Sequence, residues 1–440
     1  MKRFNMISGF LILLFLPAAL IGQPLELSLQ ESIQIALEQN IQFQTAAKSL
    51  EIADAKLYES LGNFLPTVDA TLVKNIDEKV MSIEMPPFVP GTDPINVELD
   101  FTKNYQAALG LTQPIFTGGA VWFNYKQNLY ALKAEEEKYR KQKLITIFDV
   151  KKSYYSVLLT EELIKVANEA LSLTTQTYKT TKALYDQGVA SKFELLNSEV
   201  EMENVKPRLI AAKNSRKLSE LAFKNLLQIE DKNIFLTREL EFIDRKFTLD
   251  TLYKIANELR PDLKQMEYQE NQMDYIVNLS YSAFSPIVAL SANYNYRKDN
   301  FNFNFGNWDD YYSVNLVLSI PIFRGTKRIF KVQQAKAGLD QMRLARKAVV
   351  TGSKLEIERN YLIFYESIDK LKTQDHNITR AEENVRIANI NYEEGMITSV
   401  EMGVAQMNLI QTRIQHLQSL YEYLVSLAAV EYSVGIENFN

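Results

Sequence analysis

The side chains that usually carry catalysis or metal binding are scarce in this sequence. There is no cysteine, which excludes disulfides, thiolate metal sites, a cysteine nucleophile and a lipid-bearing cysteine. The two histidines, His376 and His416, lie far apart on charged helical stretches, which is more typical of solvated side chains than of a metal pair. There is no phosphate-binding glycine loop and no close pair of acids on a pocket-forming turn. We therefore predict a protein that is not an enzyme, with no cofactor and no bound metal.

Two short turns with the same residue pattern stand out instead. The first contains Gly188 and is followed by Glu194, and the second contains Gly395 and is followed by Glu401. Each glycine lies between two helical stretches, where a residue with positive φ lets the chain reverse. Each glutamate lies at a helix start, where a carboxylate suits the helix dipole. These residues predict two tight helical hairpins.

The composition is that of a folded and mainly helical protein. Of the 440 residues, 46% are hydrophobic and 23% are charged, which excludes a mainly disordered chain. Only 15 glycines and 12 prolines occur, so we expect long continuous helices. The net charge of -5 provides no basic patch, so nucleic acid is not an expected partner.

Residues 1–22 have the layout of a cleavable export signal. Lys2 and Arg3 precede an apolar run, and small residues follow as far as Gly22. No later segment approaches the roughly 20 apolar residues that a membrane-spanning helix needs. We therefore expect an exported chain that is either soluble or a membrane protein of the β type.

Helical periodicity predicts unusually long helices. From Ser28 to Asn63 apolar residues recur every three or four positions, and Ser28 forms a capping box with Glu31. A helix over 119–186 would be about 100 Å long, and its partner over 191–228 about 60 Å. We expect the helix over 28–63 and this partner to stack end to end beside the long helix.

Four segments alternate between apolar and polar residues, as strands with one apolar face do. We predict strands at about 67–74, 101–113, 287–297 and 311–320. Residues 75–100 contain several prolines and a glycine, and we expect a long exposed loop there. Tyrosines cluster near the loop ends of the strands, which, with the export signal, favours strands between lipid and water over a soluble sheet on a core.

The second half of the chain repeats the order of the first. A shift of 220 places Pro66 on Pro286, and a shift of 207 places Gly188 on Gly395. The predicted segments are a signal peptide at 1–22, a first repeat at 23–230 with its tip at 186–191, a connector at 231–247 and a second repeat at 248–440 with its tip at 393–399. The two shifts differ because the first loop between strands is longer.

Four strands cannot close a membrane barrel, because an open edge in lipid leaves backbone groups unpaired and single-chain barrels have at least about eight strands. We therefore expect copies of the chain to share a barrel, and a conducting pore favours three copies or more. The predicted fold class is mainly α with a small β-barrel. A secreted trimeric coiled-coil structural or adhesin-like protein is the alternative; it explains the long helices but not two matched pairs of strands.

Three features together resemble the TolC-like outer-membrane efflux channels, the outer membrane factors of tripartite export systems. A helix ends at Leu65-Pro66, a strand ends in the Pro- and Gly-containing segment 113–119 with an echo at 320–325, and two turns match at 185–191 and 392–399. The resemblance covers essentially everything after the signal. It implies a homotrimer with a shared twelve-stranded barrel in the outer membrane and a long α-helical tunnel crossing the periplasm.

The resemblance also implies partners and site residues. The partners are outer-membrane lipid, a periplasmic adaptor protein and an inner-membrane pump, whose substrates the channel conducts passively to the exterior in efflux or type I secretion. The tip positions implied to contact the adaptor are Gly188, Val189, Ala190, Ser191, Gly395, Met396, Ile397, Thr398 and Ser399. Glu401 matches the first acid of an aperture gate, Val404 stands where a second acid is expected, and Glu194 is the repeat equivalent of Glu401. Three-fold symmetry would bring such carboxylates together and favour cations.

Overall fold

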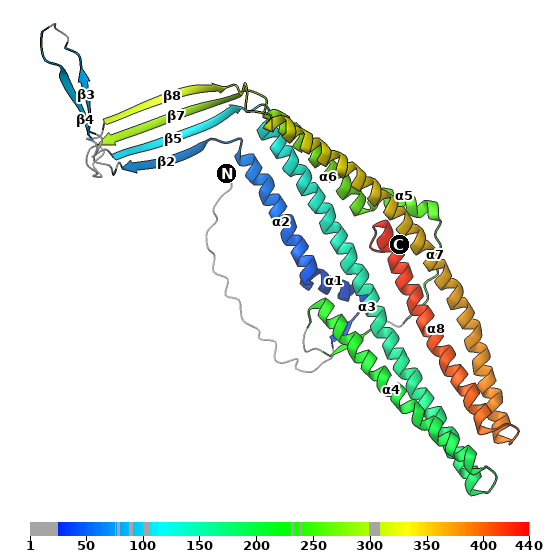
Figure 1. The fold of residues 1–440 in the computed structure, drawn as a ribbon. Coiled ribbons are helices and arrows are strands. Elements are labelled where there is room, and N and C mark those ends of the chain that lie inside the picture. The colour runs from blue at the N-terminus through cyan, green and yellow to red at the C-terminus, as the bar shows by residue number, and fades with distance from the viewer. Residues whose placement is uncertain are drawn as a thin grey trace, which may run out of the picture.

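The computed structural model describes residues 25–74, 76, 80–87, 91–100, 105–229, 233–237, 240–298 and 309–439. The export signal expected at 1–22 and the first residues of the strand expected at 101–113 lie outside the described residues. The described part is elongated, with a sheet at one end and two helical hairpin tips at the other (Figure 1).

The helices form rods of two lengths. They are α1 (Leu29–Gln39), α2 (Ile41–Gly62), α3 (Ala120–Asp186), α4 (Lys192–Leu227), α5 (Leu249–Leu259), α6 (Pro261–Ser282), α7 (Lys327–Glu393) and α8 (Ser399–Val434). Both α3 and α7 have 67 residues, or about 100 Å at about 1.5 Å per residue. Each packs against a 36-residue return helix, α4 or α8, to form a hairpin (Figure 1). Among the described helices, none combines the length and the apolar character that crossing a bilayer requires.

Short helices extend each return helix. In Figure 1, α2 and α4 follow one another along α3, and α1 contacts α4. The single helix expected from Ser28 to Asn63 is wrong in one respect, because the chain leaves helical geometry at Asn40, with φ -62° and ψ 124°. The Asn40 side chain then accepts the N–H groups of Gln42 and Phe43 and begins a new helix. Arg260 makes the corresponding break between α5 and α6.

Four antiparallel strands form the main sheet, in the order β2-β5-β7-β8. They are β2 (Thr67–Lys74), β5 (Tyr105–Phe116), β7 (Ile287–Lys298) and β8 (Asp309–Ser319). Directly opposed residues form one row of Ala70, Leu109, Tyr294 and Tyr312, and the next row, on the other face, consists of Asp69, Gly110, Asn293 and Ser313. Because side chains alternate between faces along a strand, the sheet has one mainly apolar and one mainly polar face.

The long exposed loop expected at 75–100 is wrong, because this segment contains an antiparallel hairpin. Its strands are β3 (Val80–Met85) and β4 (Ile95–Asp100), and they lie at the end of the sheet away from the helices, turned away from the direction of its strands (Figure 1). The prolines and the glycine that suggested a loop all lie between these strands, at 86–94. The flanking residues alternate between apolar and polar types, which suits paired strands.

A short parallel pair of strands joins the start of the described chain to the predicted connector. It pairs β1 (Leu25–Leu27) with β6 (Ile234–Leu236), and three residues are too few to reveal a period in the sequence. The pair covers a core in which Tyr154 of α3 and Phe223 of α4 are fully buried. Phe364 of α7 and Tyr423 of α8 anchor a second core. These cores hold the short helices to the long hairpins.

Candidate functional site

The turn between α3 and α4 is a compact glycine turn. Gly188 has φ 77°, and its N–H donates to the Tyr185 carbonyl at 2.9 Å. The Val189 N–H then donates to the Leu184 carbonyl at 2.9 Å. No atom lies within 4 Å of a Cβ built at Gly188, so the glycine is needed for backbone conformation and not for packing. Val189, the next residue of this turn, is 72% exposed.

The turn between α7 and α8 has the same construction. Gly395 has φ 70°, and the Met396 N–H donates to the Asn391 carbonyl at 2.7 Å. Met396 is 68% exposed, in the place that Val189 takes in the first turn. The two tips therefore present one apolar side chain each, next to a glycine with open space around it.

Both glutamates expected at the aperture are helix caps. The Glu194 carboxylate accepts the Ser191 N–H at 2.8 Å, and the Glu401 carboxylate accepts the Thr398 N–H at 2.8 Å and its hydroxyl at 3.0 Å. The N–H of Thr398, followed by its hydroxyl, holds the pKa of Glu401 below its ordinary value. Glu401 is therefore charged at neutral pH and fixed to the turn.

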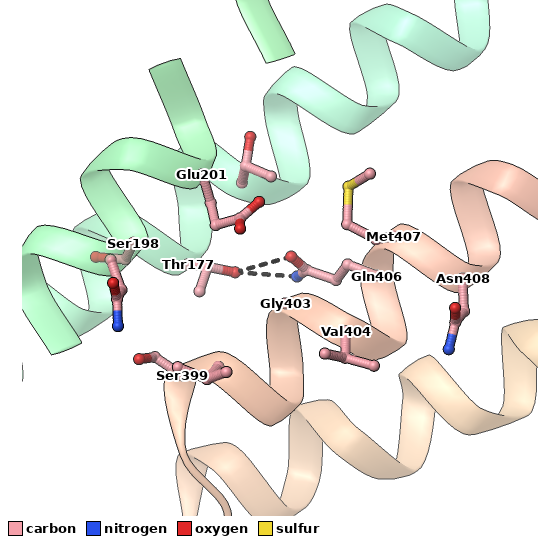
Figure 2. Close-up of a pocket in the computed structure, with 12 residues that line it drawn as sticks. Thr177, Ser198, Glu201, Ser399, Gly403, Val404, Gln406, Met407 and Asn408 are labelled. Carbon is pink, nitrogen blue, oxygen red and sulfur yellow. Dashed lines mark hydrogen bonds between the residues drawn. The ribbon is translucent and has the colours of Figure 1, made fainter. Parts of the chain in front are cut away.

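Two polar contacts join the first hairpin to the second near the tips. The hydroxyls of Thr181 on α3 and Tyr392 on α7 lie 2.6 Å apart and both side chains are buried. Gln406 of α8 donates from Nε2 to the Thr177 hydroxyl of α3 at 2.9 Å (Figure 2). Burial raises the pKa of Tyr392, so this hydroxyl is neutral at physiological pH.

These contacts were not predicted from the sequence, although α3 carries a signal for them. Thr174, Thr177 and Thr181 recur at spacings of three and four, which places them on one face of the helix. Threonine is a poor helix former, so three on one face indicate that their hydroxyls have a use there. Thr174 and Thr181 are buried.

A cavity of about 370 Å³ lies between α3, α4 and α8 beside these contacts (Figure 2). Its walls include Ser198 and Glu201 of α4 and Gly403, Val404 and Asn408 of α8. Ser399, expected at the exposed tip, instead begins α8 and is only 6% exposed, and its hydroxyl has no hydrogen-bond partner. The two hairpins are therefore packed less tightly here than in the cores near their other ends.

The histidines are placed separately. Nε2 of His416 lies 2.9 Å from Oδ1 of Asp375, and His376 is exposed on α7. In the part of the chain that the structure describes, no three His, Asp or Glu side chains lie together in a way that could hold a metal ion.

Two long hairpins, a small sheet with one apolar face and paired glycine tips define a channel-type protein of the outer membrane, and comparison with known proteins places the chain within one family. The sequence profile of the outer membrane efflux protein family matches residues 32–227 and 252–435. The chain belongs to this family.

Individual relatives are distant but match over nearly the whole chain. The alkaline protease secretion protein AprF of Pseudomonas aeruginosa is 19% identical over 423 residues, covering 93% of this chain and 85% of AprF. The probable efflux pump outer membrane protein TtgC of Pseudomonas putida is 20% identical over 400 residues, covering 88% and 78%. The CmeC outer membrane channel of Campylobacter jejuni has the same fold, with a TM-score of 0.77 at 17% identity, covering 92% of this chain and 85% of CmeC.

The family assignment gives the function at class level. The chain is an outer-membrane exit channel of the efflux or type I secretion kind, and its helical tunnel lies in the periplasm. The alternative of a secreted structural or adhesin-like coiled coil is thereby set aside.

Proposed function

We propose that the chain works as a homotrimer whose three sheets join into one twelve-stranded barrel in the outer membrane. The observation that carries this proposal is the open sheet: within the described residues, β2 and β8 each pair on one side only. Unpaired backbone groups at these edges would be costly in lipid. Pairing β8 of one copy with β2 of the next satisfies both edges, and three sheets of four strands give a barrel wide enough for a pore.

Within one chain, the packing of β5 and α3 beside β7 and α6 is a template for the contact between two neighbouring copies. Under the shifts of 207 and 220, β5 and α3 correspond to β8 and α7, and β7 and α6 correspond to β2 and α2. A Cβ built on Gly118 would lie 2.2 Å from Ser285 of the neighbouring segment, whereas the equivalent Gly325 has open space. We infer that the neighbouring copy fills the space beside Gly325. The matching elements support the proposal of two duplicated units, at 23–230 and 248–440, joined by 231–247; the export signal at 1–22 stays a prediction from the sequence.

Cysteine cross-linking tests the trimer directly because the chain has no cysteine of its own. Thr112 of β5 faces Ser291 of β7. Their equivalents are Ser319, from a shift of 207, and Thr71, from a shift of 220. The double variant Thr71→Cys/Ser319→Cys should therefore form a ladder of disulfide-linked species up to the trimer under mild oxidation.

The register provides the control for this test. Thr71→Cys/Leu318→Cys uses the same two strands, but the two side chains then lie on opposite faces of the sheet, so they should not cross-link. A monodisperse monomer in detergent, or equal cross-linking by the two double variants, would contradict the proposed barrel.

We further propose that the two tips contact a periplasmic adaptor, which links the channel to an inner-membrane pump. The support is the paired construction at Gly188 and Gly395, where open space around each glycine would admit a partner helix tip. Val189→Asp and Met396→Asp place charges on exposed side chains without disturbing the positive φ of the glycines. Together they should abolish cross-linking to the adaptor while Thr71→Cys/Ser319→Cys trimers persist. Unchanged adaptor cross-linking would refute this role.

Glu401, with Glu194 as its counterpart in the first hairpin, is the proposed gate of the periplasmic aperture. Around a three-fold axis, three Glu401 carboxylates would favour cations at the constriction. Val404, one turn later, leaves Glu401 as the single acidic position in the first turns of this helix. The Thr181–Tyr392 contact would hold the hairpins together and keep the aperture narrow.

A further inference from the structure

The β3–β4 hairpin has two unlike faces. Ile83 pairs with Val97 and Met85 pairs with Ile95, so these four apolar side chains share one face. Ile83, Met85 and Ile95 are 42%, 41% and 51% exposed. The other face carries Ser82 opposite Glu98 and Glu84 opposite Asn96.

This hairpin needs a covering partner. A two-stranded hairpin is marginally stable in water at best, and stable examples bury an apolar face.

The position of the hairpin limits which partner can cover its apolar face. The hairpin lies at the end of the sheet away from the helices, between Lys74, the last residue of β2, and Tyr105, the first of β5, and its strands are turned away from the direction of the sheet strands (Figure 1). Tyr296 of β7 lies opposite Asp310 near that end of the sheet, and tyrosines in such positions are typical of the level of the lipid headgroups. A hairpin beyond this level lies outside the acyl chains, so lipid tails do not cover it.

The acidic side chains of the hairpin favour contact with a partner through the apolar face and disfavour contact through the polar face. Between residues 80 and 100 every ionisable side chain is acidic, and there is no lysine or arginine. Copies that met through the polar face would bring Glu84 and Glu98 carboxylates together, which is unfavourable. Copies that met through the apolar face would bury it and keep the carboxylates in water.

We propose that the β3–β4 hairpins of three copies pack their apolar faces against one another over the outer mouth of the channel. This inference rests on the trimer of the proposed function, which holds three hairpins around one axis at a high effective concentration. The hairpin contact adjoins the proposed pairing of β8 of one copy with β2 of the next, because the hairpin is inserted in the chain between β2, an edge strand, and β5. The result is a closure on the external side, formed by copies of this chain and separate from the periplasmic tips.

Single cysteines test the hairpin contact. Ile83→Cys lies on the apolar face and Ser82→Cys, its neighbour on the same strand, lies on the polar face. Since the chain has no other cysteine, any disulfide must join two copies. In oxidised outer membranes Ile83→Cys should give a cross-linked dimer at least about tenfold faster than Ser82→Cys, because only the apolar faces are held together. Val97→Cys against Glu98→Cys repeats the comparison on the other strand and covers the case in which Ile83→Cys folds poorly.

The strand pair Thr71→Cys/Ser319→Cys, measured in the same membranes, separates the possible failures. If this pair cross-links but Ile83→Cys and Val97→Cys do not, or match their polar-face controls, the hairpin contact is overturned and the trimer stands. If the strand pair also fails to cross-link, the trimer and the hairpin contact are both overturned. Preferential cross-linking at the apolar positions, with an intact strand pair, supports the closure.

Discussion

Arg260 holds the last turn of α8 through a hydrogen bond from its Nη1 to the carbonyl oxygen of Ser433, at 2.6 Å. In the other half of the chain, Nδ2 of Asn40 donates to the carbonyl oxygen of Leu226 at 3.0 Å. Positions 40 and 260 correspond under the shift of 220, and positions 226 and 433 under the shift of 207. Two unlike side chains therefore make the same contact between a helix break and the end of a return helix.

Removing the Arg260 side chain should destabilise the chain measurably. Arg260 also donates to Asp262 at 2.8 and 3.0 Å and to Glu356. Arg260→Ala leaves these two carboxylates and the Ser433 carbonyl without their donor, and we expect the free energy of unfolding to fall by about 2 kcal/mol. Denaturant titration of the detergent-solubilised protein, followed by circular dichroism, measures this change.

Arg260→Lys is the control for charge alone. Lysine keeps the positive charge but lacks the planar fork that reaches several acceptors at once, so it should recover only part of the loss. If Arg260→Ala were as stable as the unchanged protein, the matched contacts would have no energetic role.

Local features of the sequence were sufficient to predict the mainly helical fold. The capping box of Ser28 and Glu31 and the positive φ of Gly188 and Gly395 are present in the structure, because each depends on residues close together in the chain. The alternating segments likewise gave the apolar and polar faces of the sheet. The breaks at Asn40 and Arg260 were not predicted, although Asn40 is a helix-capping residue and Arg260 precedes Pro261; what no local pattern shows is the contact that each makes with a helix more than 170 residues away.

Other misses have the same physical origin. The prolines at 86–94 suggested a loop over the whole of 75–100, although in the sequence they fall between the two paired strands. Thr181 and Tyr392 are 211 residues apart, and no local pattern pairs two hydroxyls at that distance. For the tip residues, sequence located the turns but not the burial of Ser399, since burial depends on how two hairpins pack.

A buried ion pair joins α3 to α8 and gives a second stability prediction. Nζ of Lys151 lies 2.6 Å from the Glu431 carboxylate, with the side chains 5% and 9% exposed. Lys151 also donates to the Glu437 carbonyl, and Glu431 accepts the Phe439 N–H at 3.0 Å. Lys151→Met should cost about 3 kcal/mol or more in the free energy of unfolding, because it leaves an unpaired buried carboxylate.

The double variant distinguishes the pair from its individual charges. In Lys151→Met/Glu431→Leu neither charge is buried alone, so stability should return most of the way toward that of the unchanged protein. Thermal unfolding at a fixed protein concentration compares Lys151→Met, Glu431→Leu and the double variant with the unchanged chain. Strictly additive losses would show that the two side chains do not interact.

Tyr392→Phe should make the periplasmic aperture open more readily. The substitution removes the hydroxyl that meets Thr181. Thr181 keeps its bond to the Thr177 carbonyl at 2.8 Å, so the variant should fold normally. Losing one neutral hydrogen bond costs about 1 kcal/mol, which corresponds to about a fivefold shift from closed toward open per chain. Single-channel conductance in planar bilayers measures this shift.

Tyr185→Phe is the matched control, because Tyr185 is the equivalent residue of the first hairpin and is 37% exposed. It should leave conductance unchanged. The pH response adds an independent check. Burial raises the pKa of Tyr392 above its ordinary value of 10.0, so the stability that the buried neutral hydroxyl contributes is fully present below pH 10 and is lost as the pH rises through the raised pKa. The Tyr392→Phe channel should lack this alkaline opening.

Glu401→Gln separates the proposed gate charge from the helix cap. A glutamine side chain can accept the same hydrogen bonds from Thr398, so the capping box persists while the charge is removed. If three carboxylates line the aperture, the preference of the channel for cations over anions should fall, with helix content unchanged. Reversal potentials in a salt gradient measure the preference. Glu31→Gln is the control, because Glu31 caps α1 through Ser28 in the same way, far from the tips.

The acid dependence of this preference follows from the lowered pKa of Glu401. Because its carboxylate is stabilised by the Thr398 N–H, the pKa in the folded chain lies below the ordinary value of 4.5. The charge, and the stability that its cap contributes, are therefore present above that value and are lost only as the pH falls through the lowered pKa. Cation preference should be present at about pH 7 and should decline in acid as Glu401 is protonated, whereas the Glu401→Gln channel should show no such decline. A decline of the same size in the Glu401→Gln channel would mean that a different group sets the selectivity.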